Sequence, residues 1–311
     1  MNQLKKIAVM GGGAVGCYYG GMLARAGLEV TLIGRAQHVE AINRDGLDFE
    51  GLQFRERVQM RASTGVAAVA GADLVLFCVK SQATEEAARM IAPHLGPQAI
   101  VIGLQNGVDN PARIAQEVRH PVAASVVYVA AYMAGPGHLK HTGRGDLVIG
   151  NMAPAGSGVS ATQLEQIASL FANAGVPCKL SDNVEGDLWG KLLINCAYNP
   201  VSALCRARYK RLTGRAETRA VMADTVREVL AVATAGGVRM PPGDWVEIAL
   251  KLSDAMPEAT SSTAQDLARG KQTEIDYLNG YVARRGAELG VPVPVNRTLH
   301  ALVKLLEEPL A

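Results

Sequence analysis

The sequence predicts an α/β fold in which a doubly wound parallel sheet is followed by an all-α C-terminal domain. In the first half of the 311 residues, apolar runs without polar alternation are separated by helical patterns. Such runs are typical of a parallel sheet that helices cover on both faces. From Val184 onwards the β signal almost disappears and a period of 3.6 residues takes over. The polar turn Ser181-Asp182-Asn183 separates the two patterns, so we expect two domains, 1–181 and 182–311.

The first half begins with a short strand, a glycine-rich turn and a helix. Further on, the segments His138–Lys140 and Asp146–Ile149 flank Gly143-Arg144-Gly145 and predict a hairpin. The other strands are expected at Leu4–Met10, Glu29–Ile33, Leu74–Val79, Ala99–Leu104 and Pro177–Leu180. The helices of this half are expected at Ala14–Ala26, Thr84–Leu95, Pro111–Val118 and Thr162–Ala174. Those of the second half are expected at Leu188–Leu204, Glu217–Ala235, Trp245–Ala255, Glu274–Leu289 and Val295–Glu307.

The composition argues against a nucleic-acid-binding or membrane-spanning protein. The net charge is only +2 and aromatic residues make up 5% of the chain, so neither a basic patch nor a base-stacking surface is indicated. The longest apolar stretch, around Val122–Ala134, is too short to cross a bilayer, and the N-terminus leaves no room for a signal peptide. The five cysteines include no C-x-x-C pair. We therefore expect a cytoplasmic protein without a disulfide framework or metal site.

A glycine-rich turn follows the first strand and reads Gly11-Gly12-Gly13-Ala14-Val15-Gly16. It contains G-x-G-x-x-G between a strand and a helix, which is the context of a dinucleotide-binding loop. In such a loop Gly11 permits the tight turn, Gly13 lets the backbone approach a pyrophosphate, and Gly16 lets the helix pack on the strand. The N–H groups of the helix N-terminus can bind the phosphates. A glycine-rich turn without a ligand is the alternative.

The end of the second strand favours NADP(H) over NAD(H). An NAD site usually carries Asp or Glu there to bind the ribose 2′-hydroxyl, whereas this strand ends in Gly34-Arg35. Arg35 can bind a 2′-phosphate with two hydrogen bonds, and Gly34 leaves space for that phosphate. Alternatively, Arg35 merely ends a strand in solvent.

Two further residues follow strands whose carboxyl ends face the cofactor crevice in this fold. Lys80 comes after Leu74–Val79, and Asn106-Gly107 comes after Ala99–Leu104. Asn106 could hold the nicotinamide or the substrate. A solvated surface lysine and a plain turn remain open as the simpler interpretations.

A later segment, Lys191-Leu-Leu-Ile-Asn195-Cys-Ala-Tyr-Asn199, places one ammonium and two amides on one face of a predicted helix. The three polar residues drift only about 80° around the helix. Because Asn is a poor helix former, two of them in an apolar helix indicate a function. A lysine beside a nicotinamide cofactor can protonate the oxygen of a carbonyl group as it is reduced. A polar stripe that faces solvent or a cleft is the alternative.

A second polar cluster contains Ser261-Ser262 and Thr273-Glu274-Ile275-Asp276. Carboxylates two residues apart cannot share a helix face, so one of Glu274 and Asp276 can face the cleft while the other faces outward. Alternatively, Thr273 caps a helix and the two carboxylates favour its dipole. Both interpretations can hold at once.

Together these motifs resemble the ketopantoate reductase (2-dehydropantoate 2-reductase) family, and the resemblance runs from end to end. The W-x-K-x-x-x-N-x-x-x-N and T-E-I-D-Y-x-N-G blocks are its specific part. Related 3-hydroxyacid dehydrogenases share a Lys–Asn helix but not the later block. The motifs that carry the resemblance are Gly11–Gly16, Gln105-Asn106-Gly107, Leu188–Cys196 with Asn199-Pro200, Ser261-Ser262 with Gln265-Asp266, Lys271–Gly280 and Gly290–Asn296.

The resemblance implies a Rossmann-type N-terminal domain and NADPH-dependent reduction of ketopantoate to pantoate, on the route to coenzyme A. It implies that Lys191 is the general acid and Glu274 a catalytic carboxylate. Because the cofactor motif and Lys191 lie in different predicted domains, we expect the substrate in a cleft between them and hypothesise that the cleft closes over it. The residues implied to bind substrate are Asn106, Asn195, Asn199 and Ser262. The residues implied to bind the cofactor are Gly11, Gly12, Gly13, Ala14, Val15, Gly16, Arg35, Lys80, Asn106 and Ala131.

One position departs from the family pattern. Some members carry a further substrate-binding Asn ten residues after the second helix Asn, and this chain has Tyr209 there. This departure leaves open a reductase of another branched or bulky 2-keto acid. A non-catalytic NADP(H)-binding sensor would need only the N-terminal motif, and the Lys191–Asn199 segment argues against it. The expected partner is thus a small-molecule 2-keto acid, with a homodimer open.

Overall fold

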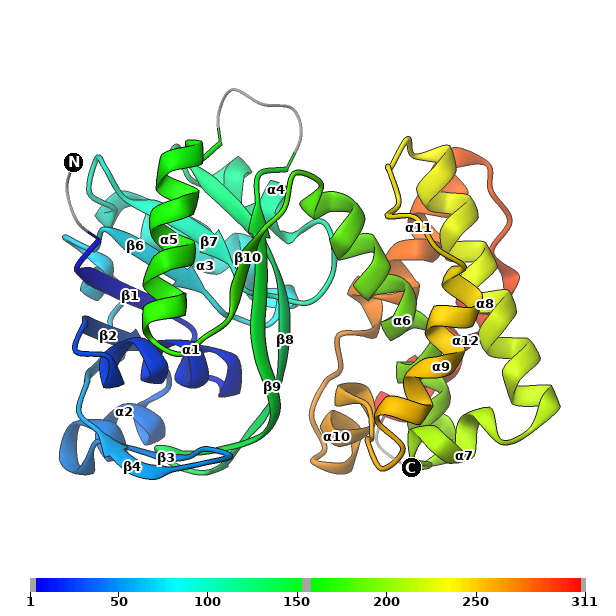
Figure 1. Cartoon of the computed structure of the whole chain (residues 1–311), viewed down its shortest axis with the longest axis horizontal. Coiled ribbons are helices and arrows are strands. Elements are labelled where there is room, and N and C mark those ends of the chain that lie inside the picture. The colour runs from blue at the N-terminus through cyan, green and yellow to red at the C-terminus, as the bar shows by residue number, and fades with distance from the viewer. Residues whose placement is uncertain (1–3, 153–157, 309–311) are drawn as a thin grey trace. The chain divides into compact units, whose positions relative to one another are not determined.

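The structure is a computed structural model and describes residues 4–152 and 158–308. The chain divides into two compact units, Met1–Val184 and Glu185–Ala311, and Figure 1 labels most of their helices and strands. The first unit is α/β, and the described residues of the second contain helices and no strand. This architecture confirms the predicted fold class.

A ten-stranded sheet forms the first unit, in the order β4-β3-β9-β8-β7-β6-β1-β2-β5, with β10 also paired to β9. The strands are β1 Lys6–Met10, β2 Glu29–Ile33, β3 Leu47–Glu50, β4 Arg55–Val58, β5 Arg61–Ser63, β6 Leu74–Phe77, β7 Ile100–Gly103, β8 Val122–Gly135, β9 His138–Gly150 and β10 Cys178–Leu180. From β5 through β2, β1, β6 and β7 to β8, neighbouring strands are parallel. Their carboxyl ends therefore lie at one edge, where ligands bind in such sheets.

The side chains of the parallel strands alternate between two separate cores. In β1, Ile7 and Val9 pack with helices α1 (Ala14–Arg25) and α5 (Ala161–Asn173) on one face. Ala8 and Met10 pack with α3 (Thr84–Ile91) and α4 (Asn110–Glu117) on the other, and α5 crosses the front of the sheet in Figure 1. Strands β6 and β7 are buried along their whole length. Burial on both faces explains why these strands are continuous apolar runs.

The predicted hairpin around Gly143-Arg144-Gly145 is wrong. Strand β9 runs through these residues and pairs antiparallel with β8, and the turn between the two strands lies at residues 136–137. The glycines instead accommodate an irregularity, because Arg144 and Gly145 have φ of 53° and 152° and the β8–β9 register shifts beside them. Glycine is favoured both in turns and in bulges, so composition alone did not separate the two.

Four strands were missed by the sequence analysis. β4, with the sequence Arg-Glu-Arg-Val, is mostly exposed and pairs antiparallel with the equally short β3, and β5 has only three residues. β8 was recognised only as an apolar stretch. β9 runs antiparallel to β8. The sheet is therefore parallel from β5 through β2, β1, β6 and β7 to β8, and mixed from β9 onwards. Helix α2 (Ala36–Asp45) follows β2.

Among the described residues of the second unit, five helices correspond to predicted ones, whereas the short helices at Tyr209–Thr213 and Ser262–Ala268 were not predicted. The predicted helix Glu274–Leu289 is wrong at its start, because a short 3₁₀ turn at Ile275–Tyr277 is followed by a break at Leu278, with φ −112° and ψ −105°. The helices are α6 Val184–Cys205, α7 Tyr209–Thr213, α8 Ala216–Ala235, α9 Trp245–Ala255, α10 Ser262–Ala268, α11 Asn279–Leu289 and α12 Pro294–Glu307. No helix in the described part of the chain is long and apolar enough to span a membrane.

Candidate functional site

The turn after β1 has the backbone geometry that its glycines predict. Gly11 has φ +116°, and a Cβ there would lie 2.7 Å from the backbone of Cys78 and Val79 at the end of β6. A Cβ on Gly16 would overlap the carbonyl oxygen of Gly11 and lie 2.9 Å from Val9 Cγ1. Both positions therefore require glycine for reasons internal to the protein.

Gly13 differs from its neighbours in the loop. It is the N-cap residue of α1, with φ −83°, and a Cβ there would meet no atom within 4 Å. Neither strain nor crowding inside the protein explains a glycine at this position. Glycine is itself favoured at a helix N-cap, and its lack of a side chain leaves the backbone open to a ligand such as a pyrophosphate; that contact stays a prediction.

The first turn of α1 can accept an anion. No side chain caps the helix, and its first turn contains no acidic residue. The backbone N–H groups and the positive end of the helix dipole are therefore left for a ligand. Ala14 and Val15 are half-buried against the main core. Gly12 lies against Leu32, and a Cβ added to Gly12 would lie 2.7 Å from Leu32 Cδ2.

Arg35 lies beside this loop. Gly34 packs against the loop so closely that a Cβ on it would lie 3.2 Å from Gly12 Cα, and Arg35 follows as the N-cap residue of α2. The Arg35 side chain is exposed, and its guanidinium has no hydrogen bond or ion pair with the described residues. The guanidinium is thus able to bind an external anion next to the loop.

Lys80 and Asn106 follow neighbouring strands, and hydrogen bonds join Asn106 to Ser81, the residue after Lys80. The Asn106 carbonyl accepts hydrogen bonds from Ser81 Oγ at 3.1 Å and Asn110 Nδ2 at 2.6 Å. Asn110 Nδ2 also donates to Ser81 Oγ at 3.2 Å, and the side chains of Ser81 and Asn110 are both buried. Lys80 is exposed at the start of the turn that Ser81 begins. The network fixes the backbone at the carboxyl ends of β6 and β7.

Charged groups close the outer side of this network. Arg113 donates to Asn110 Oδ1 at 3.0 Å and to the Ser81 carbonyl at 2.8 Å. It also forms two 2.6 Å contacts with Glu85, and this hydrogen-bonded arginine lowers the pKa of the Glu85 carboxyl despite partial burial. Ser81, Asn110 and Arg113 were not predicted, because polar residues dispersed over 33 positions give no local signal.

Ala131 lies on β8, opposite His141 of β9 and half-buried. The pairing of β8 with β7 ends at Ala124, so Ala131 lies on the part of β8 that extends past the carboxyl end of β7. A backbone contact from Ala131 to a cofactor stays a prediction.

The predicted polar face of α6 lies within the second unit. Lys191 and Asn195 are half-buried, and Asn199 is only 3% exposed. The side-chain amides of Asn195 and Asn199 form no hydrogen bond with the described residues. The fully buried unpaired side-chain atoms of the described residues do not include these two amides, so both amides are accessible and can bind a polar ligand.

Ser262 is tied to this face through its neighbour. Ser261 Oγ donates to the Asn199 carbonyl at 3.2 Å, and its N–H donates to Ser202 Oγ at 3.3 Å. Ser261 also caps α10 by accepting from the Ala264 N–H at 3.1 Å. The exposed Ser262 is the first residue of α10, so the structure brings it next to the turn of α6 that carries Asn199.

Glu274 is 7% exposed and lies in a turn that α12 holds in place. Glu307 Oε1 accepts from the N–H and the hydroxyl of Thr273, at 2.7 and 2.6 Å. Asp276 contacts His300 and Lys304 of α12 at 2.6 and 2.9 Å. The two carboxylates therefore have different surroundings, and the prediction that one of them faces a cleft stays a prediction. Thr273 does not cap α11, although its hydroxyl accepts from the Ile275 N–H at 3.2 Å.

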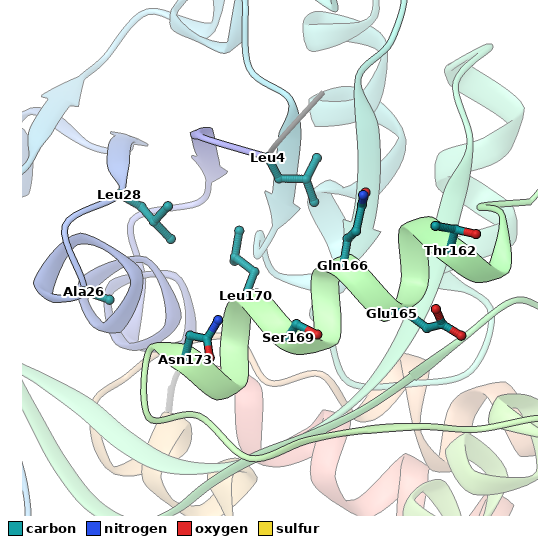
Figure 2. A pocket seen from close by; sticks show the side chains of 9 residues that line it. All are labelled: Leu4, Ala26, Leu28, Thr162, Glu165, Gln166, Ser169, Leu170 and Asn173. Carbon is teal, nitrogen blue, oxygen red and sulfur yellow. The ribbon is translucent and has the colours of Figure 1, made fainter. Parts of the chain in front are cut away.

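A hollow of ≈ 490 Å³ lies elsewhere on the first unit and is shown in Figure 2. It is lined by side chains of α5, such as Gln166 and Leu170, together with Leu4 and Leu28. No predicted site residue lines it, so the hollow is separate from the candidate site. In the described part of the chain, no three His, Cys, Asp or Glu side chains are arranged to hold a metal ion.

Comparisons with known proteins place the chain. Residues 7–154 match the family described as Ketopantoate reductase PanE/ApbA, and residues 183–307 match Ketopantoate reductase PanE/ApbA C terminal. The chain belongs to the ketopantoate reductase family. It is 31% identical over 302 residues to the 2-dehydropantoate 2-reductase of Pyrococcus horikoshii, with 97% of each chain covered.

Two solved structures of similar proteins complete the comparison. A PanE/ApbA family ketopantoate reductase from Ralstonia eutropha JMP134 is 54% identical, with a TM-score of 0.89, and 97% of this chain and 98% of that chain are covered. D-mandelate dehydrogenase in a ternary structure with NADH and anilino(oxo)acetate is 25% identical, with a TM-score of 0.86 and coverages of 97% and 98%. This family member is therefore similar, over nearly its whole length, both to ketopantoate reductases and to a dehydrogenase of another 2-hydroxy acid.

Proposed function

We propose that this member of the family reduces 2-dehydropantoate (ketopantoate) to pantoate with NADPH, as a step toward coenzyme A. The observation that carries the proposal is the full-length similarity to 2-dehydropantoate 2-reductases, which covers 97% of this chain and of the Pyrococcus horikoshii protein. The glycine geometry of the loop and the polar face of α6 support it. A non-catalytic sensor would need the first of these features and not the second.

The cofactor is proposed to bind along the loop after β1. The pyrophosphate would accept hydrogen bonds from the N-terminus of α1, next to Gly13, where no side chain intervenes. Arg35 would bind the 2′-phosphate, and this charge-assisted contact would favour NADPH over NADH. Lys80, Asn106 and Ala131 would contact the nicotinamide end. When bound, the cofactor supplies the hydride for the carbonyl carbon of the substrate.

Lys191 is proposed to be the general acid. As the hydride reaches the carbonyl carbon, negative charge develops on the oxygen, and the Lys191 ammonium stabilises this charge and donates a proton to it. Its half-buried position on α6 removes part of the surrounding water, which strengthens such an interaction. The product hydroxyl then carries the proton that Lys191 gave up.

The remaining polar groups are proposed to hold the substrate. Asn195 and Asn199 can donate to the hydroxyl or carbonyl groups of a 2-keto acid without adding charge. Ser262 can donate to its carboxylate. The buried Glu274 would act as a catalytic carboxylate that orients Lys191 or accepts a hydrogen bond from the substrate hydroxyl.

One observation favours a second candidate, the reduction of a bulkier 2-keto acid. Tyr209 packs against Tyr198 of α6, with ring centroids 4.4 Å apart and ring planes tilted by 45°. Tyr198 directly precedes Asn199. The similarity to D-mandelate dehydrogenase shows that the same fold accommodates a 2-hydroxy acid with an aromatic side chain. Tyr198 is fully buried and its hydroxyl donates to the Ala249 carbonyl at 2.9 Å, so the half-buried Tyr209 is the ring of this pair that would contact such a side chain.

The experiment that tests the proposal follows NADPH oxidation with 2-dehydropantoate, beside NADH and a panel of other 2-keto acids. Fast turnover that is selective for NADPH and 2-dehydropantoate is the expected result. If only a bulkier 2-keto acid is turned over, the proposed substrate is wrong and the proposed reaction type is retained. Tight NADPH binding without turnover of any 2-keto acid would overturn the catalytic proposal.

A further inference from the structure

A proline interrupts the hydrogen bonding of α6 in the middle of its polar face. Pro200 lies inside the helix, directly after Asn199 and four residues after Cys196. Since proline has no backbone N–H, it cannot donate the helical hydrogen bond to the Cys196 carbonyl, and its ring crowds that carbonyl. Cys196 is fully buried, where a carbonyl without a donor is costly.

Asn279 supplies a donor for the Cys196 carbonyl. This first residue of α11 donates from Nδ2 to the Cys196 oxygen at 3.1 Å, across 83 positions of sequence. The same Nδ2 donates to Asn296 Oδ1 at 3.0 Å, so both N–H groups of the amide are used. Among the described residues, the buried Asn279 Oδ1 has no hydrogen-bond partner. These two contacts fix the orientation of the Asn279 amide. If the amide were flipped, its oxygen would face the Cys196 and Asn296 oxygens, and two acceptors cannot form a hydrogen bond with each other.

The position of Asn279 is fixed in turn by α8 and α12. Asn296 Nδ2 donates to the Thr225 carbonyl at 3.2 Å and to Glu228 Oε2 at 2.8 Å. The Glu228 carboxylate also accepts the backbone N–H groups of Val295 and Asn296, both at 2.8 Å. Helices α8, α12 and α11 therefore form a chain of hydrogen bonds. The chain ends at the Cys196 carbonyl of α6, which has no helical donor because of Pro200.

We propose that Asn279 is a positioning residue for the reaction, because it holds α6 at its proline and so fixes Asn199 relative to Lys191 and Asn195. Lys191 and Asn195 precede the Cys196 carbonyl, and Asn199 follows it. A change of helix direction at this point moves the substrate amide away from the acid without touching either side chain. Displacements of about 1 Å can cost about 10²-fold in rate. This inference rests on the proposed function for its kinetic readout.

The test compares Asn279→Ala in the native chain and in a Pro200→Ala background. In the native chain we expect kcat for 2-dehydropantoate to fall by about tenfold or more, with an unchanged dissociation constant for NADPH. With Pro200→Ala, residue 200 regains an N–H that can donate to Cys196, so Asn279→Ala is expected to lower kcat by less than about threefold relative to Pro200→Ala alone. An equal loss in both backgrounds overturns the inference.

A control separates positioning from general loss of stability. Val232→Ala removes a fully buried methyl pair from α8 and leaves every polar contact of Asn279 in place. It should lower Tm by about 2–6 °C and leave kcat unchanged. If Asn279→Ala also lowers Tm with kcat unchanged, the residue is only structural and the inference is overturned.

The same variants remain informative if the native protein does not reduce 2-dehydropantoate. That result overturns the proposed function alone, and the coupling between Asn279 and Pro200 is then measured through Tm. The inference predicts that Asn279→Ala lowers Tm more in the native chain than in the Pro200→Ala background. Equal shifts of Tm contradict it.

Discussion

Each unit carries its own group of candidate site residues, and the two groups are formed by opposite means. In the first unit the loop after β1 presents backbone N–H groups. Gly11 and Gly16 allow the close backbone packing that this loop requires. In the second unit the face of α6 presents the side chains of Lys191, Asn195 and Asn199. Its helical path runs through a proline and depends on a donor 83 positions away.

This difference determines how each part responds to substitution. A backbone site keeps its chemistry when side chains change, but it fails when a Cβ blocks the turn or the ligand. A side-chain site loses its chemistry when one group is removed, while the fold survives. Substitutions in the loop should therefore act on folding or cofactor binding, and substitutions on α6 should act on the rate of the chemical step.

The largest effect is expected for Lys191→Ala. Without the proposed general acid, kcat for 2-dehydropantoate should fall by about 10²-fold or more, because the developing oxyanion would lose both a charge and a proton donor. The dissociation constant of NADPH should stay within about twofold. Steady-state kinetics and cofactor fluorescence measure the two quantities, and Lys251→Ala, on the exposed side of α9, is the matched lysine control. Unchanged turnover would remove Lys191 from this role.

Arg35→Ala tests the preference for NADPH. Loss of a charge-assisted hydrogen bond to the 2′-phosphate should weaken NADPH binding by about 10–100-fold, and NADH binding should change little. Titration of both cofactors checks this, with Arg44→Ala, on the same helix and paired with Asp45, as the control. Equal weakening for NADPH and NADH would reject the phosphate contact.

Two glycines of one loop should separate folding from binding. A Cβ on Gly16 overlaps the Gly11 carbonyl, so Gly16→Ala should lower Tm or prevent folding. A Cβ on Gly13 meets no protein atom within 4 Å, so Gly13→Ala should keep Tm and weaken NADPH binding by about tenfold. Thermal unfolding and cofactor titration distinguish them. A Gly13→Ala variant with native cofactor affinity would contradict the close approach of a ligand.

Tyr209→Asn tests the wall of the substrate site. Burial and the nearby Tyr198 raise the pKa of Tyr209 to about 12, so its hydroxyl stays protonated and its side chain uncharged at the pH of the assay. Its replacement should lower kcat/KM for bulky 2-keto acids relative to 2-dehydropantoate by about tenfold. The substrate panel measures this ratio, and an unchanged ratio would exclude Tyr209 from the substrate site.

The smallest effect concerns the stability of the second unit in acid. Burial acts to raise the pKa of Asp276, but contacts with His300 and Lys304 outweigh it and hold the pKa below its ordinary value. Such a carboxyl adds stability above its unfolded pKa of about 3.9 and loses it as pH falls through the lower native pKa. Urea unfolding at pH 7 and pH 3 should therefore show a smaller acid loss for Asp276→Asn. Equal acid losses would contradict this role.

The features predicted most clearly from the sequence are those that depend on residues close together in the chain. The spacing of Gly11, Gly13 and Gly16 encodes a turn within six residues, and the apolar runs of β6 and β7 encode strands buried on both faces. The face of α6 followed from helical periodicity alone. The resemblance to one family then gave an activity, and the comparisons support it over the whole chain.

What the sequence did not predict depends on contacts between distant residues. Gly143 and Gly145 favour a turn locally, yet pairing with β8 makes them part of one strand. The helix predicted from Glu274 breaks at Leu278. Just before it, Thr273 is held by Glu307 of another helix. The role of Asn279 depends on a carbonyl 83 positions away. A cytoplasmic location, a homodimer and the domain boundary after residue 181 stay predictions.

The most direct test compares Lys191→Ala with Gly13→Ala in single-turnover reduction of 2-dehydropantoate at saturating NADPH. The account predicts that Lys191→Ala binds NADPH normally and transfers hydride about 10²-fold or more slowly. Gly13→Ala should need more NADPH for saturation and then react at nearly the native rate. Similar losses of binding and of rate in both variants would contradict the division of labour between the two units.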